Sequence, residues 1–226
     1  MTRGAREIRD RLAVVCTTAL RVLPIEGAAL ALITRRGQQA IAHWSDELAQ
    51  RLDEMQMTLG QGPSIDAHND GHPVLSEDLA AADAGRRWPV FADAATRVGV
   101  HALYAFPLRI GVIEVGVLTM YRHERRGLGA DELSLALQLA DSAAFSMLDL
   151  FGADGEASDH RSVANPLGAG AVYRAHVHQA SGMLMIQLGI PIEEALARLR
   201  AYAFAENLAL GDVARGVVAR TLRLEQ

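Results

Sequence analysis

Residues that could bind an anion lie in two short rows near the end of the chain. The members of the two rows are Arg174, His178 and Ser181, and Gly216, Arg220 and Arg223. On helices, these spacings place each row along one edge. Arginine and histidine bind phosphate oxygens, and glycine lets another backbone approach closely. An ordinary solvated surface, with Glu193, Glu194 or Asp212 as ion partners, would show the same residues, so both interpretations stay open.

The balance of charge does not decide between these interpretations. Residues 171–226 contain six arginines and five acidic residues, a net charge of +1. This leaves 16 of the 22 basic and 22 of the 27 acidic side chains in residues 1–170. Nucleic-acid-binding domains are typically far more basic, so composition alone does not establish such a partner.

Other residue combinations that could support catalysis or bind a metal are weak. His68 and His72 are four residues apart beside Asp66 and Asp70, but in a turn-rich stretch where capping and solvation are expected instead. The single cysteine, Cys16, cannot supply both a nucleophile and a resolving thiol. The sequence also contains neither a Gly-Lys-Ser/Thr phosphate loop nor a Gly-x-Ser-x-Gly elbow. We therefore expect no enzymatic activity, metal or cofactor.

Hydrophobic periodicity predicts the elements of the first 151 residues. The predicted helices span residues 8–22, 45–56, 90–96 and 131–151. The predicted strands span residues 28–33, 39–44, 102–109 and 114–121. Ser45 is expected as an N-cap, and residues 60–73 are expected to form turns. This order predicts an α+β domain whose first and last helices pack together on one side of an antiparallel sheet.

The remaining residues change character twice. Residues 152–170 are rich in Gly, Ala, Ser and Asp and lack periodicity, so we interpret them as a linker. Helical spacing then predicts three short helices over 172–188, 192–203 and 211–221, with Gly189 ending the first. A module of about 55 residues has a marginal core and is expected to lean on a partner copy or on the preceding domain.

A glycine-rich turn and two strand motifs carry a resemblance in residues 1–151. The motifs are Leu59-Gly60-Gln61-Gly62-Pro63-Ser64, Gly71-His72-Pro73-Val74, Ala105-Phe106-Pro107-Leu108 and Val115-Gly116-Val117-Leu118. This part resembles the GAF family of sensory domains. The resemblance implies a small-molecule pocket between the sheet and the 60–73 loop, or a filled core that serves dimerisation and relay. The candidate lining residues are Trp44, Met57, His68, Trp88, His101 and Tyr104.

The helical tail, residues 171–226, resembles a second family. Its motifs are His178-Gln179-Ala180-Ser181-Gly182-Met183-Leu184-Met185, Glu194-Ala195, Leu199-Arg200-Ala201-Tyr202-Ala203 and Leu210-Gly211-Asp212-Val213-Ala214. The tail is similar to the ANTAR domain, a three-helix RNA-binding module of bacterial transcription antitermination regulators. The resemblance implies that a dimer binds paired hairpins in nascent RNA, and it adds Arg200 to the candidate RNA contacts. Ser181 stands where many ANTAR domains have a lysine.

These observations predict a cytoplasmic, homodimeric regulator in which a sensory domain controls RNA binding and antitermination. A single cysteine is consistent with a reducing compartment. The sequence contains no run of about 18 apolar residues, so it predicts no membrane span. Two alternatives belong to other classes. The tail could dock a protein partner without binding RNA, or the first domain could be a ligand-binding or redox-active enzyme.

Overall fold

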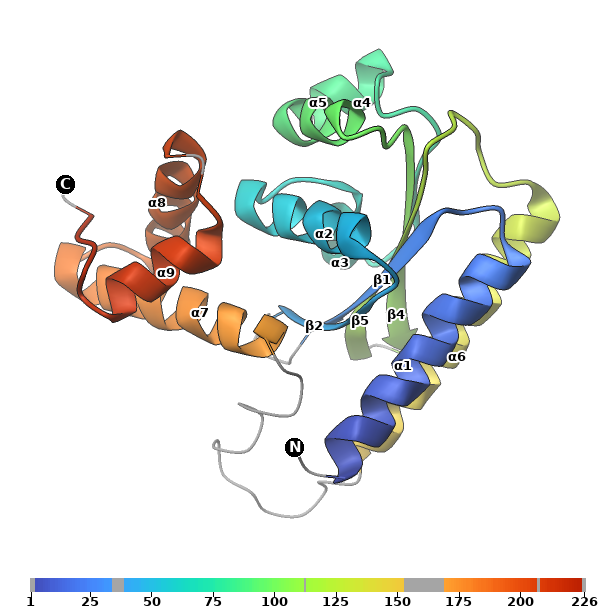
Figure 1. Cartoon of the computed structure of the whole chain (residues 1–226), viewed down its shortest axis with the longest axis horizontal. Coiled ribbons are helices and arrows are strands. Elements are labelled where there is room, and N and C mark those ends of the chain that lie inside the picture. Colours follow the sequence, from blue (N-terminus) through green and yellow to red (C-terminus); the bar gives the residue numbers. More distant parts are fainter. Residues whose placement is uncertain (1–2, 34–38, 112, 153–168, 207, 225–226) are drawn as a thin grey trace.

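The protein consists of a helix-and-sheet domain followed by a small bundle of helices (Figure 1). The structure is a computed structural model that describes residues 3–33, 39–111, 113–152, 169–206 and 208–224. The first part comprises α1 (Arg3–Val22), β1 (Gly27–Ile33), β2 (Gln39–Trp44), α2 (Glu47–Leu59), α3 (Pro63–Asp70), β3 (Val74–Ser76), α4 (Ala82–Arg87), α5 (Pro89–Arg97), β4 (Ala102–Ile110), β5 (Ile113–Arg122) and α6 (Ala130–Gly152). The second comprises α7 (Ala169–Leu188), α8 (Ile192–Ala205) and α9 (Leu210–Val218). Within the described ranges, every helix is too short or too polar to cross a bilayer.

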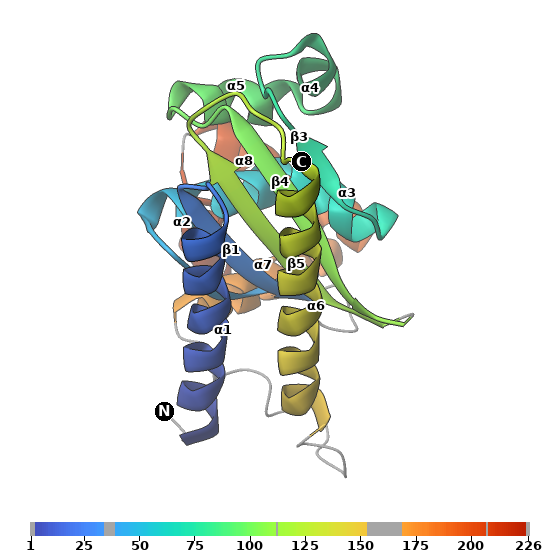
Figure 2. The same cartoon turned by 90° about the vertical axis from the view of Figure 1, so that its right-hand side faces the viewer.

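The first part is built on one antiparallel sheet with helices on both faces. Its five strands lie in the order β2-β1-β5-β4-β3, and each neighbouring pair is antiparallel. Helices α1 and α6 run side by side in opposite directions across one face (Figure 2). Helices α2 to α5 lie on the other face. The predicted α+β class and the pairing of the first and last helices are confirmed.

The core beneath α1 and α6 combines large strand residues with small helix residues. Tyr104 and Phe106 of β4 are fully buried there, in one cluster with Ala19 of α1 and Ala140 of α6. Alanines on the helices allow close approach to the sheet, and the large strand side chains fill the remaining volume. The helical spacing of these apolar residues is the signal that predicted both helices.

The stretch 60–73 differs from its prediction because it contains a helix, α3. Pro63 occupies the first turn of α3, where a missing N–H costs nothing. Oε1 of Gln56, in the last turn of α2, accepts a hydrogen bond of 2.8 Å from the backbone N–H of Ser64 and so caps α3 from a neighbouring element. The eight residues of α3 are mostly polar and small, so apolar periodicity did not reveal the helix.

The N-cap of α2 is Asp46 and not Ser45 as predicted. Oδ1 of Asp46 accepts a hydrogen bond of 2.8 Å from the N–H of Ala49. Ser45 instead accepts from the N–H of Ala28 in β1 and donates to Asp46. The short elements β3 and α4 were not predicted, because three to six residues show no period. The other predicted helices and strands of this part are present.

The three helices predicted for the second part are present, and α7, α8 and α9 pack around one small core. Gly189, with φ of 66°, ends α7 as predicted. Helix α9 ends at Val218, earlier than predicted, because Arg220 adopts the left-handed conformation with φ of 59°. The N–H groups of Arg220 and Thr221 then donate to the carbonyls of Val217 and Gly216, which is a Schellman motif. The predicted linker, residues 152–170, falls almost entirely outside the described residues.

Candidate nucleic-acid interface

The structure separates the residues of the row predicted on α7. The side chain of Arg174 lies outside the described residues, and His178 is half-buried. Ser181 is only 1% exposed, and its hydroxyl donates a hydrogen bond of 2.8 Å to the carbonyl of Val177. The prediction of an RNA contact by Ser181 is therefore corrected: its small side chain lies inside the bundle with its only donor already satisfied.

The row predicted on α9 is also rearranged. Gly216 is on α9, but a Cβ placed there would lie 3.1 Å from Cβ of Leu222. The space predicted for a sugar–phosphate is thus filled by the chain's own C-terminal turn. Arg220 and Arg223 follow the end of α9, and both are exposed. No ion pair or hydrogen bond with another described residue restrains either guanidinium.

A groove on the bundle brings an aromatic ring together with two arginines. The groove has a volume of about 610 Å³ and is lined by Arg198, Ala201, Tyr202, Ala205, Arg223 and Leu224. Tyr202 is half-buried against the bundle core. Arg198 is tethered by Glu194, whose Oε1 lies 2.9 Å from Nη2 of Arg198. Guanidinium groups beside an aromatic ring suit a nucleotide, because cations neutralise the phosphate while the ring stacks on a base.

Arg198 is the residue of this groove that the sequence did not indicate. It belongs to neither predicted row, and its spacing from Glu194 is that of an ordinary surface pair. The sequence feature that could have indicated Arg198 is its position four residues before Tyr202, which places a cation next to an aromatic ring on one helix face. Arg223 could not be joined to them from sequence, because the left-handed turn at Arg220 brings it there.

Arg200, the third arginine predicted on the bundle, does not line this groove. It points to the first domain, where its Nε–H donates a hydrogen bond of 3.1 Å to the carbonyl of Met57. Burial of the guanidinium lowers the pKa of Arg200. The structure thus places one predicted RNA contact in an interface between the two parts.

The six residues predicted to line a sensory pocket fall on both faces of the sheet. Trp88 is buried in the core beneath α2–α5, and Trp44 packs against that core. Tyr104 lies in the other core, beneath α1 and α6, so the structure corrects its assignment to a shared pocket. Met57 and His101 are half-buried, and their carbonyls accept from Arg200 and from the N–H of Leu79.

The space between the sheet and α2–α5 is filled by a hydrophobic core. Trp88, Phe91, Leu52, Leu79 and Val117 are all buried in it. The described side chains of the domain themselves therefore occupy this part of its interior. A small molecule bound there would have to displace close-packed apolar groups.

His68, the last of the six residues predicted to line the pocket, contacts an acidic side chain. Its Nδ1 lies 3.2 Å from Oε2 of Glu114 at the start of β5. Among the residues that the structure describes, no group of three or more His, Cys, Asp or Glu side chains could hold a metal ion.

The glycine-rich turn joins three helices. Gly60 ends α2 in the left-handed conformation, with φ of 66°. Oε1 of Gln61 accepts from the N–H groups of Val90 and Phe91, and so caps α5. Pro63 then begins α3. The motif therefore sets the relative positions of α2, α3 and α5.

Comparison with protein families decides the assignment of the first part. A family model described as the GAF domain matches residues 5–147, well over half of the chain. The chain belongs to the GAF domain family. A second family model, the ANTAR domain, matches residues 171–218. The chain is therefore a signalling regulator of the GAF and ANTAR type, while no curated protein matches it.

Solved structures support the fold of the GAF domain. A GAF domain/HD domain protein from Geobacter sulfurreducens matches with a TM-score of 0.53 at 14% identity, over 66% of this chain and 96% of that one. The GAF domain of a phosphoenolpyruvate-protein phosphotransferase from Coxiella burnetii matches with a TM-score of 0.52 at 14% identity, over 66% of this chain and 87% of that one. At this identity, the likeness establishes the fold alone.

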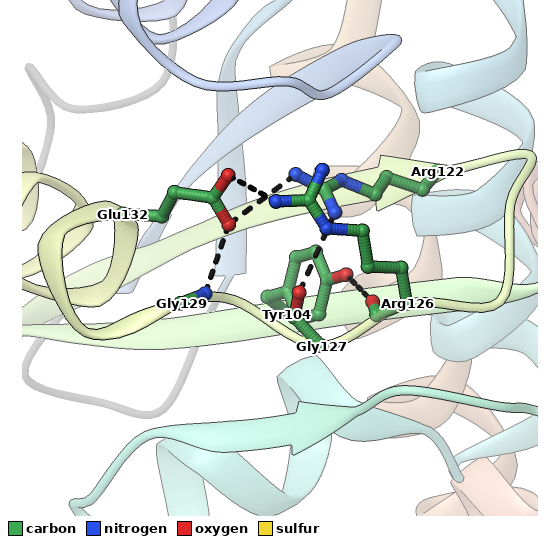
Figure 3. A network of polar contacts seen from close by, with 6 residues as sticks. All are labelled: Tyr104, Arg122, Arg126, Gly127, Gly129 and Glu132. Atoms are coloured by element: carbon green, nitrogen blue, oxygen red, sulfur yellow. Dashed lines mark hydrogen bonds and ion pairs between the residues drawn. The ribbon is translucent and has the colours of Figure 1, made fainter.

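A polar network ties the sheet of the GAF domain to the start of α6 (Figure 3). Arg122 at the end of β5 is 2% exposed, and its Nη2 lies 3.7 Å from Oε2 of Glu132. Arg126 Nη2 lies 2.7 Å from Oε1 of Glu132, and the N–H of Gly129 donates to Oε2 at 2.9 Å. The hydroxyl of Tyr104 donates to the carbonyl of Arg126. A shift of β4 or β5 would therefore reach α6 directly.

Two ionisable groups of this network, Tyr104 and Glu132, have pKa values that are shifted in opposite directions. Burial raises the pKa of Tyr104, so the phenol stays protonated and remains a donor. The backbone N–H of Gly129, together with Arg126 and Arg122, lowers the pKa of Glu132 against the effect of burial. At neutral pH, the network is thus held by an ionised carboxylate and a neutral phenol.

Proposed function

We propose that this protein is a non-enzymatic regulator whose ANTAR domain binds hairpins in nascent RNA under the control of its GAF domain. Antitermination would follow when the bound hairpin competes with a terminator. The observation that carries the proposal is the groove of Arg198, Tyr202 and Arg223 on the ANTAR domain. Arg220 stands near the end of α9, exposed and without an ion partner among the described residues.

The chemistry of the groove favours RNA over a protein partner. Both arginines can neutralise phosphates, and the tyrosine presents a ring on which an unpaired loop base can stack. A protein-docking groove would be expected to have a more apolar and less charged centre. Pure protein docking by the ANTAR domain is therefore the outcome that a negative RNA test would favour.

We further propose a homodimer formed through α1 and α6. Both helices carry large apolar side chains on their outer faces, with Val14 63% exposed and Phe145 62% exposed. Exposed apolar side chains on neighbouring helices favour association with a second copy. Equilibrium sedimentation at tens of micromolar should give a dimer, and Phe145→Glu should give a monomer. A monomeric wild-type chain would contradict this proposal.

The test of RNA binding is a titration of the full chain against a labelled RNA with two tandem hairpins, at two salt concentrations. Removing two cations that neutralise phosphates, with Arg220→Ala/Arg223→Ala, should weaken binding roughly tenfold or more, about 1.4 kcal/mol. The dependence of log K on log salt should also become shallower, by roughly one for each arginine removed.

A matched control removes the same charge elsewhere. Arg86 and Arg97 are exposed on α4 and α5, where they pair with Asp83 and Asp93. The Arg86→Ala/Arg97→Ala variant should bind RNA as the wild type does. Equally weakened binding in both double variants would mean that net charge, and not this surface, is responsible. Absence of binding in every folded, dimeric sample would overturn the RNA proposal.

A further inference from the structure

The ANTAR domain rests on the GAF domain through α8. Helix α8 contacts α2, with Thr58 and Leu59 beside it, and α7 contacts the edge strand β2 (Figure 1). The centre of the α8 contact is Arg200, whose Nε–H donates to the carbonyl of Met57. This carbonyl belongs to the last turn of α2, where helix carbonyls lack intrahelical partners and the helix dipole favours a cation. Arg200 therefore acts as a C-terminal cap supplied by another domain.

Gly60 makes room for this guanidinium. A Cβ on Gly60 would lie 2.7 Å from Nη1 of Arg200, closer than side chains pack. The next residue, Gln61, caps α5, so the turn that accommodates Arg200 also fixes the position of α5. The glycine-rich motif of the GAF domain is consequently part of the contact surface for the ANTAR domain, and movements of α2 or α5 would reach Arg200.

The contact lies next to the candidate RNA groove on the same helix. Ala197, Arg200 and Phe204 of α8 face the GAF domain, while Arg198, Tyr202 and Ala205 line the groove. Ala201 borders both surfaces. Docking therefore holds the Arg200 guanidinium on the GAF side and covers the side of α8 next to the groove.

The contact is incompletely packed, as a reversible one would be. A cavity of about 390 Å³ separates α2 and α5 from α8 and the start of α9. Phe204 lines it and remains 60% exposed. Loose packing forfeits dispersion energy, so this interface stabilises the docked arrangement weakly.

We propose that the end of α2 and the adjoining face of α5 are an internal docking surface for α8, and that docking lowers the affinity for RNA by withholding Arg200. Arg200 then exchanges between the Met57 carbonyl and an RNA phosphate. This inference rests on the proposed RNA binding. Because linkage is reciprocal, RNA that engages Arg200 must weaken docking by the same factor that docking weakens RNA binding.

The test places a positive charge on the GAF side of the contact without changing the ANTAR domain. Val90 on α5 is 36% exposed and lines the contact beside Arg200 and Phe204. Val90→Arg should repel Arg200 and separate the domains. Thr58→Arg on α2 is an independent variant of the same kind. Leu75→Arg is the matched control, because Leu75 is 39% exposed on β3, at the sheet edge opposite β2.

Each full-length variant is studied by hydrogen exchange at residues 57–61 and 197–204 and by titration with the tandem-hairpin RNA. We expect Val90→Arg and Thr58→Arg to raise exchange in both segments and to tighten RNA binding about fivefold or more. Leu75→Arg should change neither quantity. Arg200→Ala should raise exchange but weaken RNA binding, because the same side chain serves both interactions.

The two readouts separate failure of docking from failure of RNA binding. Unchanged exchange in Val90→Arg and Thr58→Arg would show that α8 does not dock on α2 in solution and would overturn the inference. Raised exchange with unchanged RNA affinity would overturn the regulatory role alone. If no variant binds RNA, the proposed function fails and the control of RNA binding fails with it, while exchange still decides whether the docking surface exists.

Discussion

The GAF and ANTAR domains are stabilised in different ways, although both are built around closed apolar cores. The GAF domain has two cores, one on each face of its sheet, and each holds fully buried aromatic side chains such as Phe91 and Phe106. Among the described side chains, the ten buried residues of the ANTAR core include four alanines and no aromatic residue. Burial of apolar area scales with side-chain size, so the GAF domain gains more stability per residue.

This difference explains how the two domains can share one signalling task. A well-packed domain resists local opening, whereas a small core leaves its helices free to adjust to a partner. The ANTAR domain also uses Arg200 to cap a helix of the GAF domain, which adds an interaction that its own core does not provide. The GAF domain is thus the rigid frame, and the ANTAR domain is the part expected to change its position.

The largest effect is expected in the GAF core. Phe91→Ala removes a fully buried ring and should lower the free energy of unfolding by about 4 kcal/mol, because apolar burial is reduced and a cavity remains. Both tryptophans, Trp44 and Trp88, lie in this domain, so urea unfolding followed by tryptophan fluorescence reports it selectively. Phe204→Ala, in the ANTAR domain and largely exposed, should leave that transition nearly unchanged.

A smaller effect is expected in the ANTAR core. Leu199→Ala should destabilise this domain by about 3 kcal/mol, which is a larger fraction of what a small core supplies. Circular dichroism should then show early loss of helix, while the tryptophan transition keeps its midpoint.

Cys16 gives a second check on the Leu199→Ala variant, because it is buried in the GAF core and burial raises the pKa of its thiol to about 12. Its resistance to thiol reagents should survive the change, and joint loss of both signals would mean that the domains unfold as one unit.

Loss of a helix cap should lower the free energy of unfolding by a smaller amount. Asp46 caps α2 through the N–H of Ala49 and also accepts from the hydroxyl of Tyr121 at 3.0 Å. Asp46→Ala removes these two hydrogen bonds and the one from the Ser45 hydroxyl, and it should lower the stability of the GAF domain by about 2 kcal/mol, measured by urea unfolding. Asp83→Ala is the control, because this exposed carboxylate forms a surface ion pair with Arg86, and a similar loss there would argue against the cap.

The smallest expected effect is a pH dependence of stability that comes from the polar network at the start of α6. The pKa of Glu132 is lowered in the folded state, chiefly by the Gly129 N–H, so its stabilisation is full above the unfolded pKa of about 4.3. It is lost as the pH falls through the lower, folded pKa. Wild type should therefore lose more stability than Glu132→Gln between pH 6 and pH 3. Identical losses in the two proteins would show that Glu132 is not linked to folding.

The elements that the sequence predicted are those with a long apolar period. Helices α1, α6 and α7 span five or more turns, and the paired strands β4 and β5 show continuous apolar runs. Helix α3 was missed because it is polar and is capped by Gln56, a side chain from another element. The cap at Asp46 was misplaced by one residue, because adjacent serine and aspartate are both good caps and only packing decides between them.

The candidate site likewise has features that the sequence predicted and features that only the tertiary structure decided. Residue types and motif spacing were enough to indicate two domains, their families and the arginines predicted to bind RNA. Tertiary structure decided which of those side chains reach a surface: Ser181 is inside the bundle, Gly216 packs against Leu222, and Arg200 caps a helix of the GAF domain. Periodicity is a local property and can be read along the chain, whereas exposure depends on which distant segment comes to lie on each face. The groove of Arg198, Tyr202 and Arg223 exists only because a left-handed turn at Arg220 folds the end of the chain back onto α8.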